Sequence, residues 1–212
     1  MKSSNESLQE LQHIKKMMER SSKFISLSGL SGIAAGVCAL IGAWFAAGFI
    51  DQGIKYDESG YKDTGALQFP LLLIALATFV VAFITSFLFT YFRSKKTGTP
   101  IWGTTSLRLF WNIAIPLAAG GLFLIRCMQL EYYELIAPGC LIFYGLALVN
   151  AAKYTLGEVR FLGYAQILLG IINLWMVGYG LYFWAAGFGL LHIIYGAIMW
   201  YKYERISTND QQ

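Results

Sequence analysis

A run of 27 residues without a charge or a proline, residues 24–50, constrains this chain more than any other feature. At about 1.5 Å per residue, such a helix is long enough to cross a hydrocarbon core of ~30 Å with some tilt. The chain of 212 residues is 57% hydrophobic and 13% charged, against roughly 25% charged residues in soluble domains. The sequence therefore predicts an all-α, polytopic membrane protein. A β-barrel is excluded because its strands would alternate in polarity.

Further apolar runs follow the first one, separated by polar loops and turn residues. We expect six transmembrane helices arranged as three hairpins. Their predicted bounds are residues 24–50, 67–92, 109–128, 135–152, 161–177 and 181–201. Residues 24–202 then form one transmembrane bundle, and residues 203–212 form a polar cytoplasmic tail.

The segment before the first span, residues 1–23, is polar but contains apolar residues at helical spacing. They are Leu8, Leu11, Ile14 and Met18. Basic residues cluster near its end, so the segment predicts a cytoplasmic amphipathic helix at the membrane surface. It could also dock a partner or anionic lipid.

The distribution of basic residues predicts the orientation of the bundle. With six spans, both termini share one side, and that side carries 13 of the 16 Lys and Arg residues. By the positive-inside rule, both termini are cytoplasmic. The six tryptophans fall at or near predicted span ends, as expected for aromatic belts. The net charge of +4 thus has a membrane explanation and does not indicate a nucleic-acid partner.

Small residues follow the first span at helical spacing. Ser28, Gly32 and Gly36 lie four residues apart, and Ala39 and Ala43 belong to a neighbouring row. In lipid, small residues allow helix backbones to approach closely. We expect this face to be a packing surface, either within the bundle or toward a second copy or another membrane protein.

The polar side chains at membrane depth gather in the last three spans. His192 is the one ionisable group well inside a predicted span, which makes it a candidate functional residue. Tyr144, Gln166, Asn173 and Tyr195 lie near its level when depth is counted along the helices. One interpretation is a pocket of all five residues that binds a neutral or amphipathic ligand. The other is that these groups only hydrogen-bond one another between helices.

No pattern in the sequence favours an enzyme. A zinc site needs at least three ligands, whereas the chain has two histidines. The acidic residues all lie in loops or terminal segments, so no Ser–His–acid set shares one depth. We expect neither a metal site nor a cofactor. The three cysteines make no disulfide framework, and free thiols are favoured over a bridge between Cys127 and Cys140.

The last two predicted hairpins share a short pattern. Tyr144-Gly145 in the fourth span and Tyr195-Gly196 in the sixth are each followed by a Lys-Tyr pair at the inner end. Parallel repeats of this kind occur in some transporters. The alternative is a chance match between apolar segments that are rich in glycine and tyrosine.

The segment MMERSSKFISLSGLSGI, Met17 to Ile33, resembles the opening of a group of uncharacterised six-helix bacterial inner-membrane proteins. A weaker likeness extends across the later spans. The resemblance implies a location in the bacterial inner membrane, and it implies no activity and no site residue.

Two functions fit these observations. The first is a carrier or receptor for a small neutral or amphipathic molecule or lipid, with its site around His192. The second is a non-catalytic regulatory or assembly subunit that uses the small residues of the first span and the basic N-terminal helix. A carrier should contain a cavity near the polar residues, whereas an assembly subunit should have a filled interior.

Overall fold

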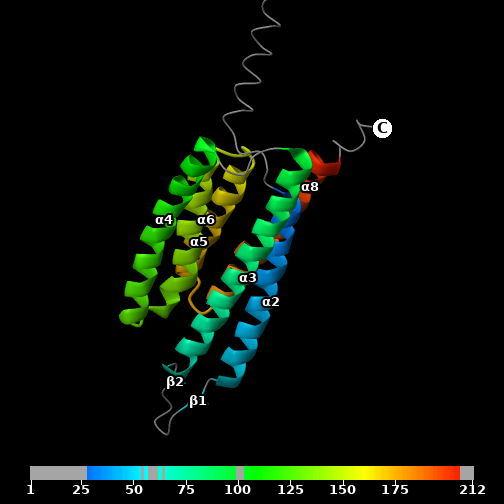
Figure 1. Cartoon of the computed structure of the whole chain (residues 1–212). Helices are drawn as coiled ribbons and strands as arrows, with labels where there is room; N and C mark the ends of the chain where they lie inside the picture. Colours follow the sequence, from blue (N-terminus) through cyan, green and yellow to red (C-terminus); the bar gives the residue numbers. More distant parts are fainter. Residues whose placement is uncertain (1–27, 54, 57–61, 64, 99–102, 206–212) are drawn as a thin grey trace, which may run out of the picture.

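The computed structural model describes residues 28–53, 55–56, 62–63, 65–98 and 103–205. The predicted amphipathic helix of residues 1–23 and residues 206–212 of the predicted tail lie outside this part. Figure 1 shows long helices running side by side. The α-helices of the described chain are α2 (Gly29–Gly53), α3 (Gly65–Thr97), α4 (Thr104–Gln129), α5 (Ile136–Ala151), α6 (Val159–Trp175), α7 (Gly180–Trp184) and α8 (His192–Trp200). A 3-10 turn, η1 (Tyr133–Leu135), precedes α5, and two π-helical segments, η2 (Ala185–Leu191) and η3 (Tyr201–Arg205), precede and follow α8.

Five helical stretches of the described chain are long and apolar enough to cross a membrane. They are Gly29–Asp51, Gln68–Lys96, Thr104–Gln129, Tyr133–Ala151 and Gly180–Tyr203. Helix α6 is apolar too, but it has only 17 residues. The predicted helical class is confirmed, and every predicted span overlaps a helix. The six-span topology stays a prediction.

The connection between α2 and α3 contains a small ladder where a polar loop was expected. Strand β1 (Lys55–Tyr56) pairs antiparallel with β2 (Lys62–Asp63), with Lys55 opposite Asp63. A ladder of two residues per strand contributes little stability alone. It brings the end of α2 close to the start of α3, so the two helices pack antiparallel. We call this end of the molecule the Asp51 end and the opposite one the Lys202 end.

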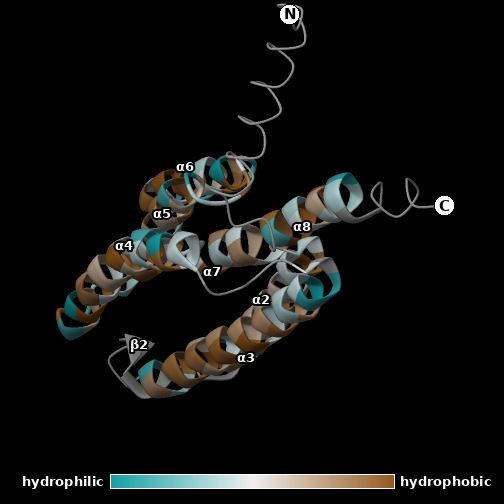
Figure 2. Cartoon of the chain, turned by 45° about the horizontal axis from the view of Figure 1, so that its top comes forward, coloured by the Kyte–Doolittle hydropathy of each residue, from teal (hydrophilic) through white to brown (hydrophobic). Residues whose placement is uncertain are grey.

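The helices pack in two groups. Helix α2 packs along α3 and α8, whereas α5 packs between α4 and α6. Figure 2 shows the two groups side by side with α7 between them, and α7 contacts α5 and, less extensively, α2. Two predicted hairpins, α2–α3 and α4–α5, are therefore packed helix pairs.

The last predicted hairpin is different. After α6 the chain turns at Gly178, whose φ of +87° is readily adopted by glycine. It then crosses from one group to the other, and α8 packs against α2. Helix α6 makes only limited contact with α7 and η2.

Glycines set the close approach of α2 to η2 and α8. A Cβ atom placed on Gly36 would lie 2.6 Å from the carbonyl oxygen of Gly189, and one on Gly32 would lie 3.1 Å from Cα of Gly196. On the other side, a Cβ atom on Gly196 would lie 2.6 Å from the amide nitrogen of Ile33. The two backbones are thus in direct contact, which maximises dispersion attraction in an apolar solvent.

Helix α3 lies at the edge of the molecule. It packs extensively on α2 and on no other described helix, and no residue in its most apolar 18-residue window is buried. Phe79, Phe83 and Phe87 form a stacked, exposed row along it. Most of α3 is hydrophobic in Figure 2, as expected for a helix that faces lipid.

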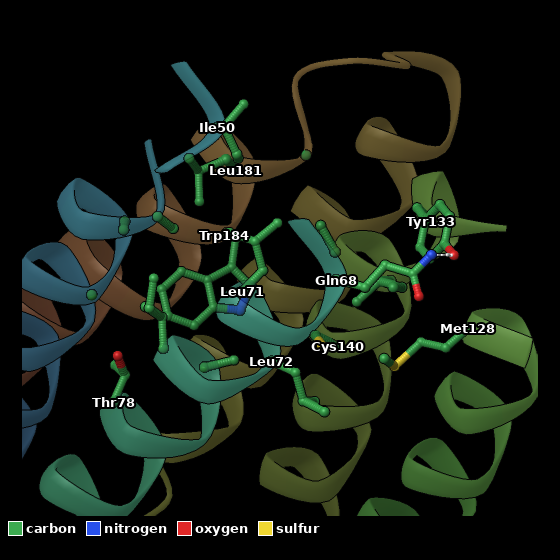
Figure 3. A pocket seen from close by; sticks show the side chains of 18 residues that line it. Ile50, Gln68, Leu71, Leu72, Thr78, Met128, Tyr133, Cys140, Leu181 and Trp184 are labelled. Carbon is green, nitrogen blue, oxygen red and sulfur yellow. Dashed lines mark hydrogen bonds between the residues drawn. The ribbon is translucent and has the colours of Figure 1, made fainter. Parts of the chain in front are cut away.

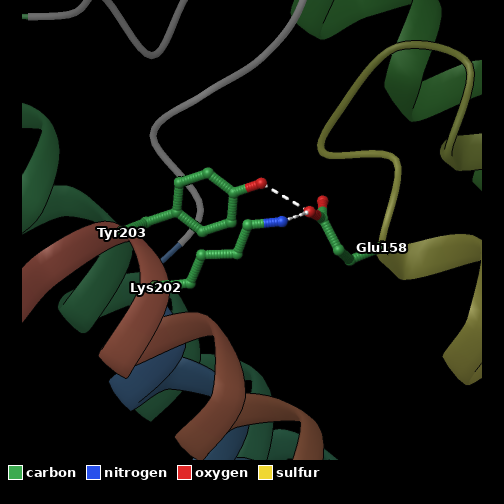
Figure 4. A network of polar contacts seen from close by, with 3 residues as sticks. All are labelled: Glu158, Lys202 and Tyr203. Atoms are coloured by element: carbon green, nitrogen blue, oxygen red, sulfur yellow. Dashed lines mark hydrogen bonds and ion pairs between the residues drawn. The ribbon is translucent and has the colours of Figure 1, made fainter.

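A polar contact joins the two helix groups at the Lys202 end. Glu158, just before α6, accepts hydrogen bonds of 2.5 Å from Lys202 Nζ and from the hydroxyl of Tyr203 (Figure 4). Partial burial raises the pKa of the Glu158 carboxyl group. The hydrogen bonds from Lys202 and Tyr203 outweigh that effect and hold the pKa below its ordinary value.

Candidate functional site

Three of the predicted site residues meet in a buried hydrogen-bonded network. The hydroxyl of Tyr144 on α5 lies 2.8 Å from Nε2 of His192, the first residue of α8. On the other side of the imidazole, Nδ1 lies 3.0 Å from the carbonyl oxygen of Gly187. The Nε2 group of Gln166 on α6 donates to the same oxygen at 2.8 Å. Gln166 has an exposed fraction of 0% and His192 of 7%.

The partners in this network define the tautomer of His192. The carbonyl of Gly187 only accepts hydrogen bonds, so Nδ1 of the imidazole must donate to it. In a neutral ring Nε2 is then an acceptor, and the Tyr144 hydroxyl donates to it. The carbonyl of Gly187 thus accepts two side-chain hydrogen bonds, from His192 and from Gln166.

The π-helical segment η2 supplies the carbonyl at the centre of the network. Its sequence, AAGFGLL, contains two glycines, and both are buried. The backbone N–H of His192, at the end of this segment, donates to the carbonyl of Gly189. A π-helical turn interrupts the regular i→i−4 hydrogen bonds of an α-helix. Backbone groups freed by such an interruption can be satisfied by neighbouring side chains. Here the side chains of Gln166 and His192 both bond to the carbonyl of Gly187.

The other two predicted pocket residues lie apart from this network. Asn173 is buried near the end of α6 and donates to the carbonyl of Met176 at 3.3 Å. Tyr195 packs beside the buried residues Leu156, Val159 and Met199 toward the Lys202 end. The structure therefore brings Tyr144, Gln166 and His192 into one hydrogen-bonded network, whereas Asn173 and Tyr195 have other neighbours.

The small residues predicted on the first span all lie in contacts within the chain. Ser28 is buried, and its carbonyl accepts a hydrogen bond of 2.6 Å from the Ser31 hydroxyl. Gly32 and Gly36 face α8, as described above. Ala39 and Ala43 are buried as well.

A half-open cavity of about 420 Å³ lies elsewhere, toward the Asp51 end. Its walls come from α2, α3, α5 and α7, together with Met128 at the end of α4 and Tyr133 in η1. Figure 3 shows these side chains, with Trp184 of α7 among them. None of the five predicted pocket residues lines it, whereas Ala43 from the first span does. The cavity forms because α3 packs on α2 without closing against α4 and α5.

The lining of the cavity is apolar and carries no formal charge. Aliphatic side chains such as Leu71, Ile74 and Ile136 make up most of it. Polar groups come from Gln68 and Tyr133, which are hydrogen-bonded to each other, and, farther along the cavity, from the Thr78 hydroxyl and the indole N–H of Trp184 (Figure 3). Pockets for small molecules commonly measure ~300–1,000 Å³ and combine apolar walls with a few polar groups. This cavity has that size and character.

A second hollow of about 890 Å³ lies on the other side of α2 and α7. Its lining includes Trp44, Phe49 and Tyr182, whose side chains are exposed. Asp51 lies at its rim and brings a charge that the first cavity lacks. It is about as open as the first cavity, and it lies near the membrane interface, where tryptophan and tyrosine are common.

A chain of aromatic rings runs from the first cavity to the buried network. Trp184 lines the cavity and packs on Phe188 of η2, with ring centroids 5.1 Å apart. Phe188 in turn packs on Tyr144 at 5.0 Å and on His192 at 6.0 Å. The two features are therefore neighbours, and the same segment, α7 to η2, takes part in both.

The described residues include no group of three or more His, Cys, Asp or Glu side chains that could hold a metal ion. Cys127 and Cys140 are free thiols, and Cys140 lines the cavity. No family model, curated protein or solved structure matches the chain. The helices themselves indicate a multi-pass α-helical membrane protein, and the cavity is its candidate binding site.

Proposed function

We propose that this chain is a bacterial inner-membrane protein that acts as a carrier or receptor for a small neutral or amphipathic molecule or lipid. We further propose that the ligand occupies the cavity between α3 and α5, and not the network around His192. The observation that carries the proposal is an uncharged, largely apolar cavity of about 420 Å³ among helices of membrane length.

The filled surroundings of His192 support this choice of site. Both imidazole nitrogens have hydrogen-bond partners within the chain, and aromatic rings pack on its face. A ligand there would first have to break these hydrogen bonds, and each buried polar group that it failed to pair again would cost ~1–3 kcal/mol. The cavity requires no such displacement.

The position of α3 supports entry from the bilayer. Because α3 makes no extensive contact with α4 or α5, the cavity can be reached between these helices from the lipid phase. The alternative role as an assembly subunit has less support, since Gly32 and Gly36 face α8 of the same chain.

The proposed orientation has six spans with both termini in the cytoplasm. Helix α6 would be a short span, since 17 residues lie at the lower limit of ~17–25 for crossing a bilayer. A membrane-impermeant maleimide tests this orientation on a variant whose three native cysteines are replaced by serine and whose C-terminal tail carries one added cysteine. Labelling only after the membrane is opened agrees with it, and labelling of intact spheroplasts contradicts it.

The substitution Ala75→Phe tests the ligand site. Ala75 lines the cavity on α3, and a phenyl ring there would fill part of the space. We expect apolar small molecules that copurify with the wild-type protein, identified by mass spectrometry of organic extracts, to be largely lost from this variant.

The matched control is Ala77→Phe. Ala77 lies on the same helix, is exposed and does not line the cavity. It should retain the same small molecules as the wild-type protein. Equal retention by Ala75→Phe, with the fold intact by circular dichroism, would show that the cavity is not the binding site.

A further inference from the structure

The polar end of the cavity is a single hydrogen-bonded pair. Gln68 lies in the first turns of α3 and Tyr133 in η1, so the pair joins two segments 65 residues apart in the sequence. Both residues lie at the Asp51 end, where the helices begin and end. In Figure 3 the pair stands at one side of the cavity, and Trp184 and Thr78 lie farther along it.

The pair offers one type of recognition whichever way the amide is oriented. If the amide nitrogen of Gln68 donates to the Tyr133 oxygen, then the Tyr133 hydroxyl remains as a donor and Gln68 Oε1 as an acceptor. If the amide is flipped, the Gln68 amide remains as a donor and the Tyr133 oxygen as an acceptor. Either way, a donor and an acceptor lie side by side. A hydroxyl group, which both donates and accepts, matches them.

The charge around this end disfavours an anionic head group. No residue that lines the cavity is charged. Asp51 follows the lining residue Ile50, and Glu134 follows Tyr133, and both acidic residues are exposed. A carboxylate or phosphate placed at the pair would lose hydration without a lining cation to offset the loss.

The apolar part of the cavity is elongated. Lining residues on α3 run from Gln68 to Thr78. Ten helical steps of 1.5 Å correspond to roughly 15 Å. Ala43 and Ala46 of α2 face this length, and at its far end Gly42 lies against the side chain of Thr78. A single alkyl chain can therefore extend from the polar pair toward Thr78.

We infer that the ligand is an uncharged single-chain amphiphile with a hydroxyl head group, held by Gln68 and Tyr133, with its chain between α3 and α5. This inference rests on the proposed function and adds the chemical class of the ligand. The head group lies near the membrane interface and the chain lies at hydrocarbon depth, which is the arrangement that such a molecule already has in a bilayer.

The test uses the full-length protein in phosphatidylcholine nanodiscs and a dodecanol probe with a diazirine near the chain end. Photolabelling should mark peptides around Thr78 and Trp184, and unlabelled competitors should reduce it. We expect dodecanol to compete about tenfold more strongly than dodecyl methyl ether, which lacks a donor, because one hydrogen bond of ordinary strength corresponds to about that factor. Dodecane and laurate should compete more weakly than dodecyl methyl ether.

Variants link this preference to the pair. In Tyr133→Phe and Gln68→Leu, labelling of the cavity should persist while the preference for dodecanol over its ether disappears. The control Tyr132→Phe removes a neighbouring exposed hydroxyl that does not line the cavity, and it should keep the preference. Thermal unfolding of each variant checks that it is folded.

The outcomes separate the two proposals. Labelling of the lining with equal competition by all four molecules would overturn the hydroxyl head group while supporting the cavity as a binding site. Strongest competition by laurate would overturn the uncharged class. An absence of saturable labelling in the lining of the wild-type protein would overturn the proposed site itself, and the head group with it.

Discussion

At the scale of single residues, glycine determines how closely this bundle packs. Gly36 and Gly196 lie against backbone atoms of the facing helix, where even a methyl group would collide. In water, glycine weakens a helix by roughly 1 kcal/mol relative to alanine. At the α2–α8 contact that cost is offset by backbone contact between two helices in an apolar solvent. The same residue type is therefore essential at one position of α2 and dispensable at another.

Gly36→Ala and Gly48→Ala test this difference. A Cβ atom on Gly36 would lie 2.6 Å from the Gly189 carbonyl oxygen, whereas one on Gly48 would meet nothing within 4 Å. Overpacking of this kind typically costs about 1–3 kcal/mol. We expect Gly36→Ala to lower the free energy of unfolding in dodecyl sulfate by about that amount, measured by circular dichroism.

Gly48→Ala is the control, since it makes the same change on the same helix. It should leave the free energy of unfolding unchanged or raise it slightly. If both variants unfold alike, the close contact between α2 and α8 does not stabilise the bundle.

At the scale of helices, hydropathy predicted where elements lie better than how they pair. Continuous apolar runs are local, so the helices of residues 24–50 and 67–92 could be predicted from sequence and overlap α2 and α3. The packing partner of α8 could not be predicted from sequence. Proximity along the chain favours α6, whereas the structure packs α8 on α2. The π-helical turns of η2 have no distinct hydropathy pattern and could not be predicted either.

The shared Tyr-Gly pattern illustrates the same limit. Gly145 approaches α6, where its Cβ position lies 2.7 Å from the Gly163 carbonyl oxygen, whereas Gly196 approaches α2. Both glycines allow a close helix contact, but the contacts are with different partners. The pattern thus marks close packing in each helix, and the packing geometry does not support equivalent hairpins.

The contact between Glu158 and Lys202 links the two helix groups and should depend on pH. The folded pKa of Glu158 is lowered, so its contribution to stability is present above the ordinary glutamate value of 4.5 and is lost as the pH falls through the folded value. Glu158→Gln should therefore melt at a lower temperature than the wild-type protein at pH 7. The difference should shrink progressively as the pH is lowered from 4.5.

Glu134→Gln is the matched control, because Glu134 is an exposed carboxylate near the Asp51 end. It should melt like the wild-type protein across the same pH range. A difference for Glu158→Gln that stayed constant with pH would mean that the carboxylate charge is not what joins the helices.

At the scale of the whole molecule, the candidate site combines residues that no local pattern connects. Tyr144, Gln166 and His192 could be selected from sequence, because polar groups at membrane depth are rare and their depth can be counted. The cavity could not be predicted from sequence, because its lining residues Ala43, Ala75 and Trp184 are ordinary apolar residues on three different helices. Only the gap left by α3 in tertiary packing makes them a site.

The central claim is that this cavity binds an amphiphile from the membrane, and Trp184 reports on it directly. The measurement uses a variant that retains Trp184 and replaces the other five tryptophans by phenylalanine. In nanodiscs, chain-brominated dodecanol should quench its fluorescence with saturation, unlabelled dodecanol should reverse the quenching, and Ala75→Phe should abolish the saturable part. Quenching that rises in proportion to the probe and is unchanged by Ala75→Phe would show simple partitioning into lipid and contradict the claim.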